Sequence, residues 1–196
     1  MARFIDPNRF VASKSFSEEA WLEARRSGVT ATQVAKAATP AGFEQVVREY
    51  RSNEPVEDNA YMRFGREWEG PIAMTLKNKH AIMPNDWVIQ SAENPRHMAT
   101  PDGLSMDHQT ISEIKTTGTE WKTIPAQYIR QVQWQLYVTG ANLCVFAWML
   151  RDEFDGVLIP AWFEPEIRFI DRDEDMIETL VKVADELWER VNNAEV

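Results

Sequence analysis

The sequence predicts an α/β fold in which a mixed central β-sheet is flanked by helices. Segments with helical periodicity alternate with segments that have the apolar pattern of strands. The 196 residues, 44% of them hydrophobic, are enough for one well-buried core and few for two. Neither an internal repeat nor a low-complexity linker divides the chain. We therefore expect residues 1–196 to form a single domain of layered helices and sheet.

The first half of the chain is predicted to be mainly helical. Ser15 with Glu18 can cap a helix that contains Trp21, and Thr30 with Gln33 has the pattern of a capping box for a helix through residue 38. Thr39 and Pro40 form an N-cap and a first-turn proline for the next helix. Apolar residues at helical spacing mark two longer helices: Phe43, Val46, Val47 and Tyr50 in one, and Tyr61, Phe64, Trp68, Ile72 and Leu76 in the other.

The second half is predicted to alternate strands and helices. Strand-like segments cover residues 87–90, 110–115, 143–150 and 157–163. Pro125 opens a helix that ends at residues 140–142. Asp171 with Glu174 is predicted to cap an acidic C-terminal helix of about residues 171–192, packed on the domain through the apolar stripe Ile177, Leu180, Val181, Ala184, Leu187, Trp188 and Val191.

Two short motifs carry the chemistry. Pro101-Asp102-Gly103 is followed, ten residues after the glycine, by Glu113-Ile114-Lys115. Residues 110–115 have the period of a strand, so Glu113 and Lys115 point to one face. Ile111 and Ile114 differ in parity, which predicts a strand that is buried on both sides or bulged near Ile114. On neighbouring strands, the two carboxylates are a ligand pair of the kind that Mg²⁺ prefers, and Lys115 can steady an attacking water and the charged phosphorus.

Each motif also has an ordinary structural interpretation. Glu-x-Lys is common on the solvent face of a strand, and Pro-Asp-Gly is a frequent turn in which glycine supplies a positive φ. The order and separation of the two motifs favour a divalent-metal site that hydrolyses phosphodiester bonds.

The pattern resembles the PD-(D/E)xK nuclease superfamily, with its restriction-endonuclease-like fold, and narrows to the branch of phage lambda exonuclease and the YqaJ-type viral recombinases. Four segments carry the resemblance in the family's order. They are Trp21 to Thr32 (Trp-x-x-x-Arg, then Gly-Val-Thr-Ala-Thr), Met62 to Glu69 (with Gly-x-x-x-Glu), Ala99 to Leu104 with Ser112 to Lys115, and Tyr128 to Thr139 (Tyr-x-x-Gln-Val-Gln).

The resemblance implies a role for each matching residue. Asp102 and Glu113 would be metal ligands together with the Ile114 carbonyl, and Lys115 would orient and activate the nucleophile. Glu69 would bind a water or a second metal ion, although Pro71 predicts a kink or break in its helix. Gln131 would hydrogen-bond near the nucleophilic water, with Gln133 and Gln135 as rivals. The implied cofactor is Mg²⁺, for which Mn²⁺ can substitute, with two ions in each site.

A 5′-phosphate pocket is implied at Arg25 and Thr32. Thr32 would lie in the first turn of the helix that Thr30 caps, where free N–H groups attract anions. Arg25 could add a bidentate contact, and Arg26 would replace it if the helix were rotated. The family usually has serine where this chain has Thr32.

Aromatic residues near these motifs are candidates for contact with DNA. We assign Trp21 and Tyr128 to the DNA-binding residues. Trp21, Trp121 and Trp134 could stack an unpaired base. The segment 116–122, directly after Lys115, is placed to touch a DNA strand.

The resemblance thus implies a Mg²⁺-dependent 5′-to-3′ exonuclease that digests the 5′-ended strand of duplex DNA, preferably 5′-phosphorylated, and leaves a 3′ overhang for phage-type recombination. It also implies a ring-shaped homotrimer and a single-strand annealing protein as partner. Two alternatives remain: a related endonuclease that cuts internally, or a non-catalytic acidic protein that takes part in DNA processing.

A net charge of −10 argues at first against nucleic acid as the substrate. Residues 164–196 hold eleven acidic and four basic residues, a balance of −7, which leaves −3 for residues 1–163. DNA need not touch the acidic C-terminal segment, and bound cations would neutralise the metal-binding carboxylates.

The remaining composition predicts a soluble, intracellular protein with no membrane partner, and the resemblance implies a cytoplasmic protein of a bacterium or phage. The chain has no apolar run of about 18 residues, and residues 1–7 do not have the pattern of a signal peptide. Cys144 is predicted to be a core residue of a central strand. We assign no zinc or catalytic role to His80, His97 or His108, because their spacing is not that of ligands.

Overall fold

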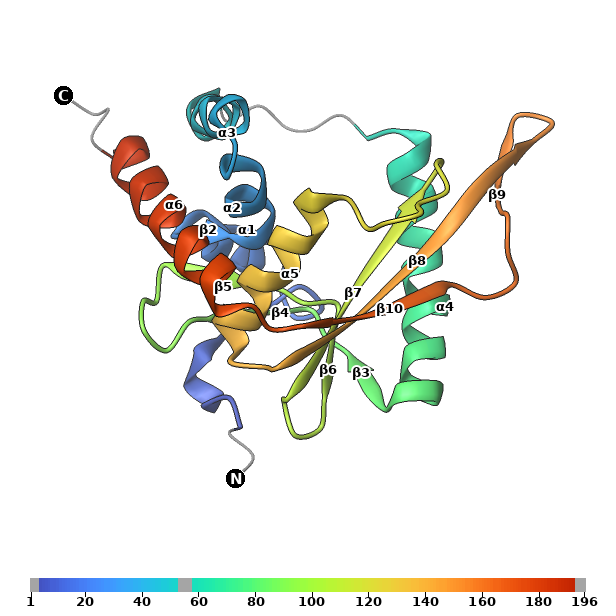
Figure 1. The fold of residues 1–196 in the computed structure, drawn as a ribbon, viewed down its shortest axis with the longest axis horizontal. Coiled ribbons are helices and arrows are strands. Elements are labelled where there is room, and N and C mark those ends of the chain that lie inside the picture. The colour runs from blue at the N-terminus through green and yellow to red at the C-terminus, as the bar shows by residue number, and fades with distance from the viewer. Residues whose placement is uncertain (1–3, 53–57, 193–196) are drawn as a thin grey trace.

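The computed structural model describes residues 4–52 and 58–192 and has a mixed α/β fold (Figure 1). Two predictions concern ranges that lie partly outside the described residues. One is that residues 1–7 are not a signal peptide, and the other is that residues 1–196 form a single domain, which stays a prediction. After a short 3₁₀ turn at Pro7–Arg9, the helices are α1 Glu18–Arg26, α2 Ala31–Ala37, α3 Pro40–Ser52, α4 Ala60–His80, α5 Ala126–Thr139 and α6 Glu174–Asn192. The strands are β1 Phe10–Ser13, β2 Val29–Thr30, β3 Ile82–Pro84, β4 Trp87–Gln90, β5 His97–Ala99, β6 Gly103–Ser105, β7 Thr110–Thr117, β8 Leu143–Phe154, β9 Val157–Pro160 and β10 Glu166–Asp171.

The larger sheet is mixed, as the sequence predicts. It has six strands in the order β10-β8-β7-β6-β3, with β9 paired to β8. β7 and β8 are parallel and in register from Thr110 opposite Leu143 to Thr117 opposite Leu150, whereas the other pairs in this sheet are antiparallel. A smaller four-stranded sheet has the order β1-β4-β5-β2.

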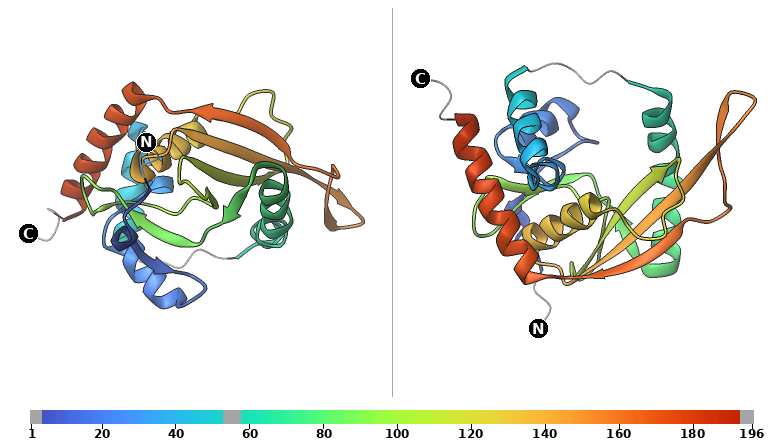
Figure 2. Two further views of the ribbon diagram at one scale, coloured as in Figure 1. Left: turned by 90° about the horizontal axis from the view of Figure 1, so that it is seen from below. Right: turned by 45° about the horizontal axis from the view of Figure 1, so that its top comes forward.

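Helices cover both faces of the central strands β7 and β8. Figures 1 and 2 show α5 and α4 on opposite sides of these two strands. Along β8, Cys144, Phe146 and Trp148 join the core cluster that contains α5, while Val145, Ala147 and Met149 join the cluster that contains α4. Burial on both faces explains the continuous apolar sequence of β8 and confirms the core position of Cys144.

β7 is also buried on both sides. Ile111 belongs to the cluster under α5 and Ile114 to the cluster under α4. Its pairing with β8 has no register shift. The first of the two alternatives for this strand is therefore correct, and a bulge near Ile114 is not needed to explain the parity of the two isoleucines.

Several helix ends follow the predicted caps. Gln33 Oε1 accepts a 2.9 Å hydrogen bond from the Thr30 backbone N–H, and Thr39 Oγ1 accepts one of 3.2 Å from Gly42. Gly140 ends α5 in the left-handed conformation, with φ of 78°.

Two predicted caps and one predicted strand were wrong in position. Ser17, not Ser15, caps α1 by accepting a 3.1 Å hydrogen bond from Ala20. Asp173, not Asp171, caps α6 by accepting one of 3.0 Å from Met176. Asp171 is the last residue of β10, a strand that was not predicted. The strand predicted over residues 157–163 ends at Pro160. In both helices, the residue that caps lies directly before the first helical residue, two positions after the predicted one.

The predicted break of the helix at Pro71 was wrong, because α4 continues through it from Ala60 to His80, and the alternative, a kink without a break, stays a prediction. Gly70 offers a physical reason. A proline clashes with the Cβ of a preceding residue in the α conformation, and glycine has no Cβ. Glu69 therefore lies on an unbroken helix.

None of the helices in residues 4–52 and 58–192 has the length and apolar character needed to cross a membrane.

Candidate active site

The hairpin of β6 and β7 brings the two sequence motifs together. Asp102 directly precedes β6, and its backbone N–H donates a 3.0 Å hydrogen bond to Ser112 on β7. Its side-chain Oδ2 accepts a 2.6 Å hydrogen bond from the Ile114 backbone N–H. The ten residues between Asp102 and Glu113 therefore form a hairpin that places Asp102 beside Glu113 and Lys115. This is the arrangement on neighbouring strands that the sequence predicts.

Gly103 serves close packing and not a positive φ. Among the described glycines, positive φ values occur at Gly140 and Gly156 and not at Gly103. A Cβ at Gly103 would lie 2.5 Å from Ser112 Oγ and 2.7 Å from Ile82 Cγ2. The turn interpretation of Pro-Asp-Gly was thus wrong for its glycine, which allows β6 to pass between β3 and β7.

Glu113 is buried and hydrogen-bonded at both carboxylate oxygens. The residue is 2% exposed. Gln131 donates a 2.6 Å hydrogen bond to Oε1, and Gln135, one helical turn further along α5, donates one of 2.6 Å to Oε2. Lys115 Nζ forms an ion pair with Oε1, which confirms that the two side chains share a face of β7.

Gln133, the other rival, points away from this carboxylate. Its Nε2 donates to the Asp171 carbonyl and its Oε1 accepts from the Asp173 N–H, both at 2.8 Å. Of the three glutamines, Gln131 and Gln135 therefore belong to the site, and Gln133 secures the junction of β10 and α6.

Acidic groups outnumber basic groups at this site. Burial, followed by the charge of Glu113, raises the pKa of Asp102 well above its usual range. Burial lowers the pKa of Lys115, but the carboxylates of Glu113 and Asp102 outweigh it, so the net shift is upward and the ammonium form is favoured. Two carboxylates thus face one ammonium group, an arrangement that a divalent cation would neutralise.

The donor set fits a hard divalent cation. Mg²⁺ is usually held by one or two carboxylates, with waters and substrate oxygens completing its octahedron. Asp102 and Glu113 supply such a pair. Within the described residues, no cluster of three or more His, Cys, Asp or Glu side chains is placed to hold an ion. The role of Glu69 as a further ligand stays a prediction.

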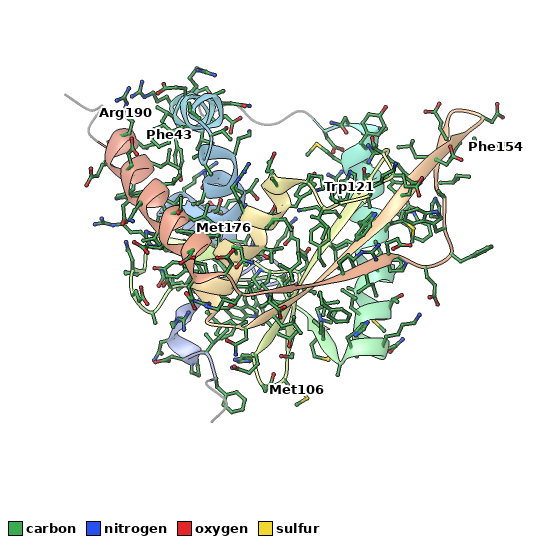
Figure 3. The ribbon with its side chains drawn as sticks, viewed as in Figure 1. Phe43, Met106, Trp121, Phe154, Met176 and Arg190 are labelled. Atoms are coloured by element: carbon green, nitrogen blue, oxygen red, sulfur yellow. The ribbon has the colours of Figure 1, made fainter. Side chains whose placement is uncertain are left out.

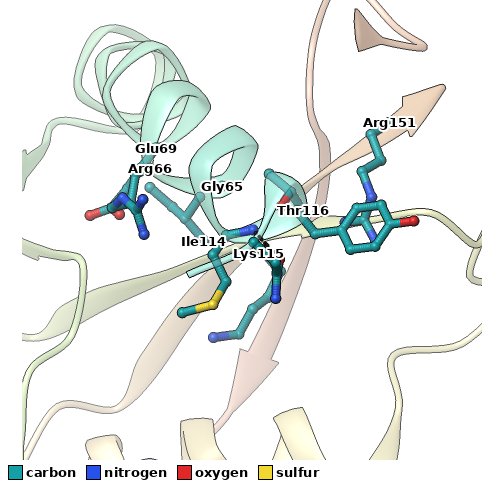
Figure 4. A pocket seen from close by; sticks show the side chains of 10 residues that line it. Gly65, Arg66, Glu69, Ile114, Lys115, Thr116 and Arg151 are labelled. Atoms are coloured by element: carbon teal, nitrogen blue, oxygen red, sulfur yellow. Dashed lines mark hydrogen bonds between the residues drawn. The ribbon is translucent and has the colours of Figure 1, made fainter. Parts of the chain in front are cut away.

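Glu69 faces the site of Asp102, Glu113 and Lys115 from α4. With Ile114 and Lys115 it lines a pocket of about 500 Å³ (Figure 4). Although the residue is exposed, desolvation raises the pKa of its carboxyl; Lys14 opposes the rise, Glu113 adds to it and Lys115 opposes it. The charge of Glu69 in turn raises the pKa of Asp102, so Glu69 lies near the Asp102–Glu113 pair, on the side of the pocket.

Arg25 and Thr32 lie on α1 and α2. The Arg25 guanidinium stacks 4.3 Å from the Trp21 ring centroid, and burial lowers its pKa. Arg26 is exposed. Thr32 is exposed in the first turn of α2, as predicted. None of the carboxylates in the described residues forms an ion pair with Arg25.

Tyr50 and Lys14 lie close to residues of α1, of α2 and of the segment between them. Burial raises the pKa of Tyr50 to about 12, and its hydroxyl lies 2.8 Å from the Gly28 carbonyl and 3.1 Å from Gln33 Oε1 on α2. Lys14 Nζ lies 5.5 Å from the Trp21 ring centroid, and the charge of Lys14 lowers the pKa of Glu69. Lys14 Nζ also forms a 3.4 Å ion pair with Glu18, so its charge is already partnered on α1.

The aromatic candidates divide into partly accessible and buried rings. Lys115 Nζ lies 5.2 Å from the ring centroid of Tyr128, and Trp121 packs 5.2 Å from Tyr128 (Trp121 is labelled in Figure 3). Trp134 is fully buried and donates a 2.9 Å hydrogen bond to the Met98 carbonyl. The predicted stacking role of Trp134 was therefore wrong, because a core ring has no open face for a base.

The chain has the fold of known alkaline exonucleases. LHK-Exo, an alkaline exonuclease from Laribacter hongkongensis, superimposes with a TM-score of 0.70 at 23% identity, over 90% of this chain and 93% of that one. A phage-related exonuclease from Haemophilus somnus 129PT superimposes with a TM-score of 0.66 at 13% identity, over 85% and 94% of the two chains. The fold is thus that of the PD-(D/E)xK nucleases, and Asp102, Glu113 and Lys115 occupy one site within it.

Residues 20–142 match the YqaJ-like viral recombinase domain, and the chain belongs to this family. The resemblance found in the four sequence segments is therefore confirmed. None of the curated protein sequences matches the chain significantly.

Proposed function

We propose that the protein is a Mg²⁺-dependent 5′-to-3′ exonuclease that digests the 5′-ended strand of duplex DNA and leaves a 3′ single-stranded overhang for recombination. The observation that carries the proposal is the contact of Lys115 with Glu113 beside the Asp102 carboxylate, at the wall of an open pocket. Family membership and fold support a nuclease.

The residues of the site would divide the chemistry among them. Asp102 and Glu113, with the Ile114 carbonyl, would hold Mg²⁺ or Mn²⁺, and Glu69 would contact a second ion or its water. When bound, the metal supplies charge neutralisation and an acidified water. Lys115 would orient the attacking water and stabilise negative charge on the phosphoryl oxygens. Gln131 and Gln135 would fix the orientation of Glu113, as their hydrogen bonds to both oxygens indicate.

The 5′ polarity rests on Arg25 and Thr32. A half-buried guanidinium without a carboxylate partner in the described residues is suited to bind a terminal phosphate. Thr32 offers its hydroxyl from the first turn of α2. Trp21 orients Arg25 by stacking. Tyr128, beside Lys115, is a further candidate for contact with the strand.

The assembly is also part of the proposal. The resemblance to the lambda exonuclease branch implies a ring-shaped homotrimer that encircles DNA, and an annealing protein that coats the 3′ overhang. A ring would also ease the electrostatic objection, because topology retains the substrate of a chain with a net charge of −10.

The proposal is tested on linear duplexes with 5′-phosphate or 5′-hydroxyl ends, labelled separately on each strand, and on a closed circle, with Mg²⁺ or EDTA. We expect Mg²⁺-dependent loss of the 5′-phosphorylated strand and intact circles. Lys115→Met should lower the rate about 10²- to 10⁴-fold. Lys182→Met, an exposed lysine on α6, is the matched control and should leave it unchanged.

Cleavage of circles would replace the exonuclease by an endonuclease that uses the same residues. Absence of metal-dependent digestion at every salt concentration would overturn the enzymatic proposal and favour the non-catalytic DNA-processing protein. Loss of the 3′-ended strand would reverse the proposed polarity.

A further inference from the structure

Three cationic side chains line the pocket of about 500 Å³ at the candidate site, and they differ in whether a carboxylate pairs with them. Lys115 pairs with Glu113, and Arg66 Nη2 lies 2.9 Å from both carboxylate oxygens of Asp58. Within residues 4–52 and 58–192, no carboxylate forms an ion pair with Arg151. In Figure 4, Arg151 lies at the end of the pocket opposite Glu69 and Arg66. One end of the pocket therefore carries an uncompensated positive charge.

Two other elements hold the Arg151 guanidinium in place. Its central carbon lies 4.5 Å from the ring centroid of Tyr61, in the first turn of α4. A Cβ at Gly118, in the loop after β7, would lie 3.3 Å from Arg151 Nη2, so this loop passes directly beside the guanidinium. A guanidinium that stacks through its face keeps the N–H groups of its edge free for an anion. The arrangement presents a fixed anion-binding edge at the pocket.

The register of the sheet relates Arg151 to Lys115. Lys115 lies opposite Trp148 on the parallel strand β8, and Arg151 is three residues further along. At about 3.3 Å per residue, the two positions are on the order of 10 Å apart along the strands. Successive phosphates of one DNA strand are about 3.4 Å apart along the duplex axis. Because the offset is odd, Arg151 leaves the sheet on the α4 side, where it meets Tyr61, and Lys115 leaves it on the α5 side, where it meets Tyr128. A phosphate at Arg151 would therefore belong to a different nucleotide from one at Lys115.

We propose that Arg151, oriented by Tyr61, binds a backbone phosphate of the DNA strand close to the scissile bond and so positions that strand at the pocket that Lys115 lines. The inference rests on the proposed function, because it assigns a second substrate contact to the same pocket. Arg151 would be a positioning residue that acts on the intact part of the strand and not on the reacting phosphate. No sequence motif pointed to it, since the parallel pairing of β7 and β8 brings residue 151 to a pocket built around residue 115.

The test uses duplexes that each carry one uncharged methylphosphonate linkage, at one of the three linkages that follow the terminal linkage inward along the 5′-ended strand. Dissociation constants are measured in EDTA for the wild type, Arg151→Gln and Arg190→Gln, an exposed arginine on α6 with the same charge change. In the wild type, the uncharged linkage should weaken binding about tenfold at the contacted position. In Arg151→Gln, the fully charged duplex should bind about tenfold more weakly, and the methylphosphonate at that position should have no further effect.

Further readouts separate binding from folding. The slope of log Kd against log salt concentration should fall by about one in Arg151→Gln and stay unchanged in Arg190→Gln. Arg151→Lys keeps the charge and should recover part of the affinity, even if Arg151→Gln folds poorly. Tyr61→Leu should weaken binding about threefold, whereas Tyr61→Phe, which keeps the ring, should not.

The outcomes distinguish the two proposals. If the wild type neither binds nor digests duplex DNA, the proposed function fails and the inference fails with it. If the wild type digests DNA but Arg151→Gln behaves like Arg190→Gln in affinity, salt slope and methylphosphonate response, the inference on Arg151 is overturned and the proposed function stands.

Discussion

Gln131 donates a 2.6 Å hydrogen bond to Oε1 of Glu113, the same oxygen that Lys115 contacts from β7. Gln135 serves the other oxygen at the same distance. A buried carboxylate is costly unless its oxygens are paired, so α5 stabilises the acidic site as well as lying beside it. The spacing of four residues between the two glutamines, one helical turn, allows a single helix to reach both oxygens.

We predict that Gln131→Leu lowers the free energy of unfolding by about 1–3 kcal/mol in EDTA, because a hydrogen bond to a buried charge is lost. Gln127→Leu is the matched control, since Gln127 is exposed on the same helix. Urea denaturation of both variants measures the difference. Equal stabilities would mean that the hydrogen bond to Glu113 contributes nothing.

The chemistry of β7 could be predicted from the sequence because it depends on local periodicity. Side chains two residues apart on a strand share a face, so the contact of Glu113 with Lys115 follows once the strand is recognised. The contact of Asp102 with Ile114 needed one further step, a hairpin of plausible length. The two glutamines could not be separated from Gln133 without knowing which face of α5 meets the sheet.

Other features depend on contacts that no local pattern records. The burial of Trp134 and the place of Arg151 follow from tertiary packing and from the register of β8. Where rules competed locally, the sequence was ambiguous. Proline argued for a break at residue 71, whereas the glycine before it removed one of the clashes that proline causes. Ser15 and Ser17 were equally good caps by residue type, and the helix begins directly after Ser17.

Gly103→Ala should destabilise the protein by about 1–3 kcal/mol, because its Cβ would lie 2.5 Å from Ser112 Oγ and force β6 away from its neighbours. Gly65→Ala on α4 is the matched substitution. Its Cβ would meet Thr116 Oγ1 at 3.4 Å, an ordinary contact, and alanine favours the helix by about 0.5–1 kcal/mol. Thermal unfolding should therefore shift in opposite directions for the two variants.

Asp102→Asn should raise the unfolding temperature in EDTA and abolish the effect of Mg²⁺ on it. The substitution removes one of two carboxylates that crowd the buried site, while the amide oxygen can still accept the hydrogen bond from Ile114. In the wild type, Mg²⁺ should raise the unfolding temperature, because a ligand that binds the folded state stabilises it. Asp152→Asn, an exposed residue of β8, should keep the wild-type response. A Mg²⁺ shift that persists in Asp102→Asn would exclude Asp102 as a ligand.

His97 should make stability fall as the pH drops. Its Nδ1 lies 3.0 Å from the Tyr137 hydroxyl, and its Nε2 lies 3.1 Å from both Asp185 Oδ1 and Asn94 Nδ2. Burial lowers its pKa from the usual 6.5, although Asp185 opposes the shift. As the pH falls below about 6.5, the unfolded chain binds a proton before the folded protein does, so stability is lost down to the lowered folded pKa.

His97→Gln tests this prediction through the difference in unfolding free energy between about pH 7.5 and 5.5, measured in urea. The variant will be less stable at both pH values, because it changes a buried, hydrogen-bonded residue. Its loss of stability between the two should nevertheless be smaller than that of the wild type. An unchanged difference would show that other groups cause the pH dependence.

Arg25→Gln should remove the preference for 5′-phosphorylated ends while digestion of 5′-hydroxyl ends continues at the wild-type rate. The expected loss of preference is about 10- to 100-fold, the range for one charged, bidentate contact worth about 1.5–3 kcal/mol. Arg26→Gln is a close control, because Arg26 is the next residue of α1, carries the same charge and is exposed, whereas Arg25 packs over Trp21. Competition between differently labelled 5′-phosphate and 5′-hydroxyl duplexes gives the ratio directly. If Arg26→Gln lost the preference and Arg25→Gln kept it, the phosphate contact would belong to the exposed face of α1. The stacking of Arg25 on Trp21 would then be a packing contact.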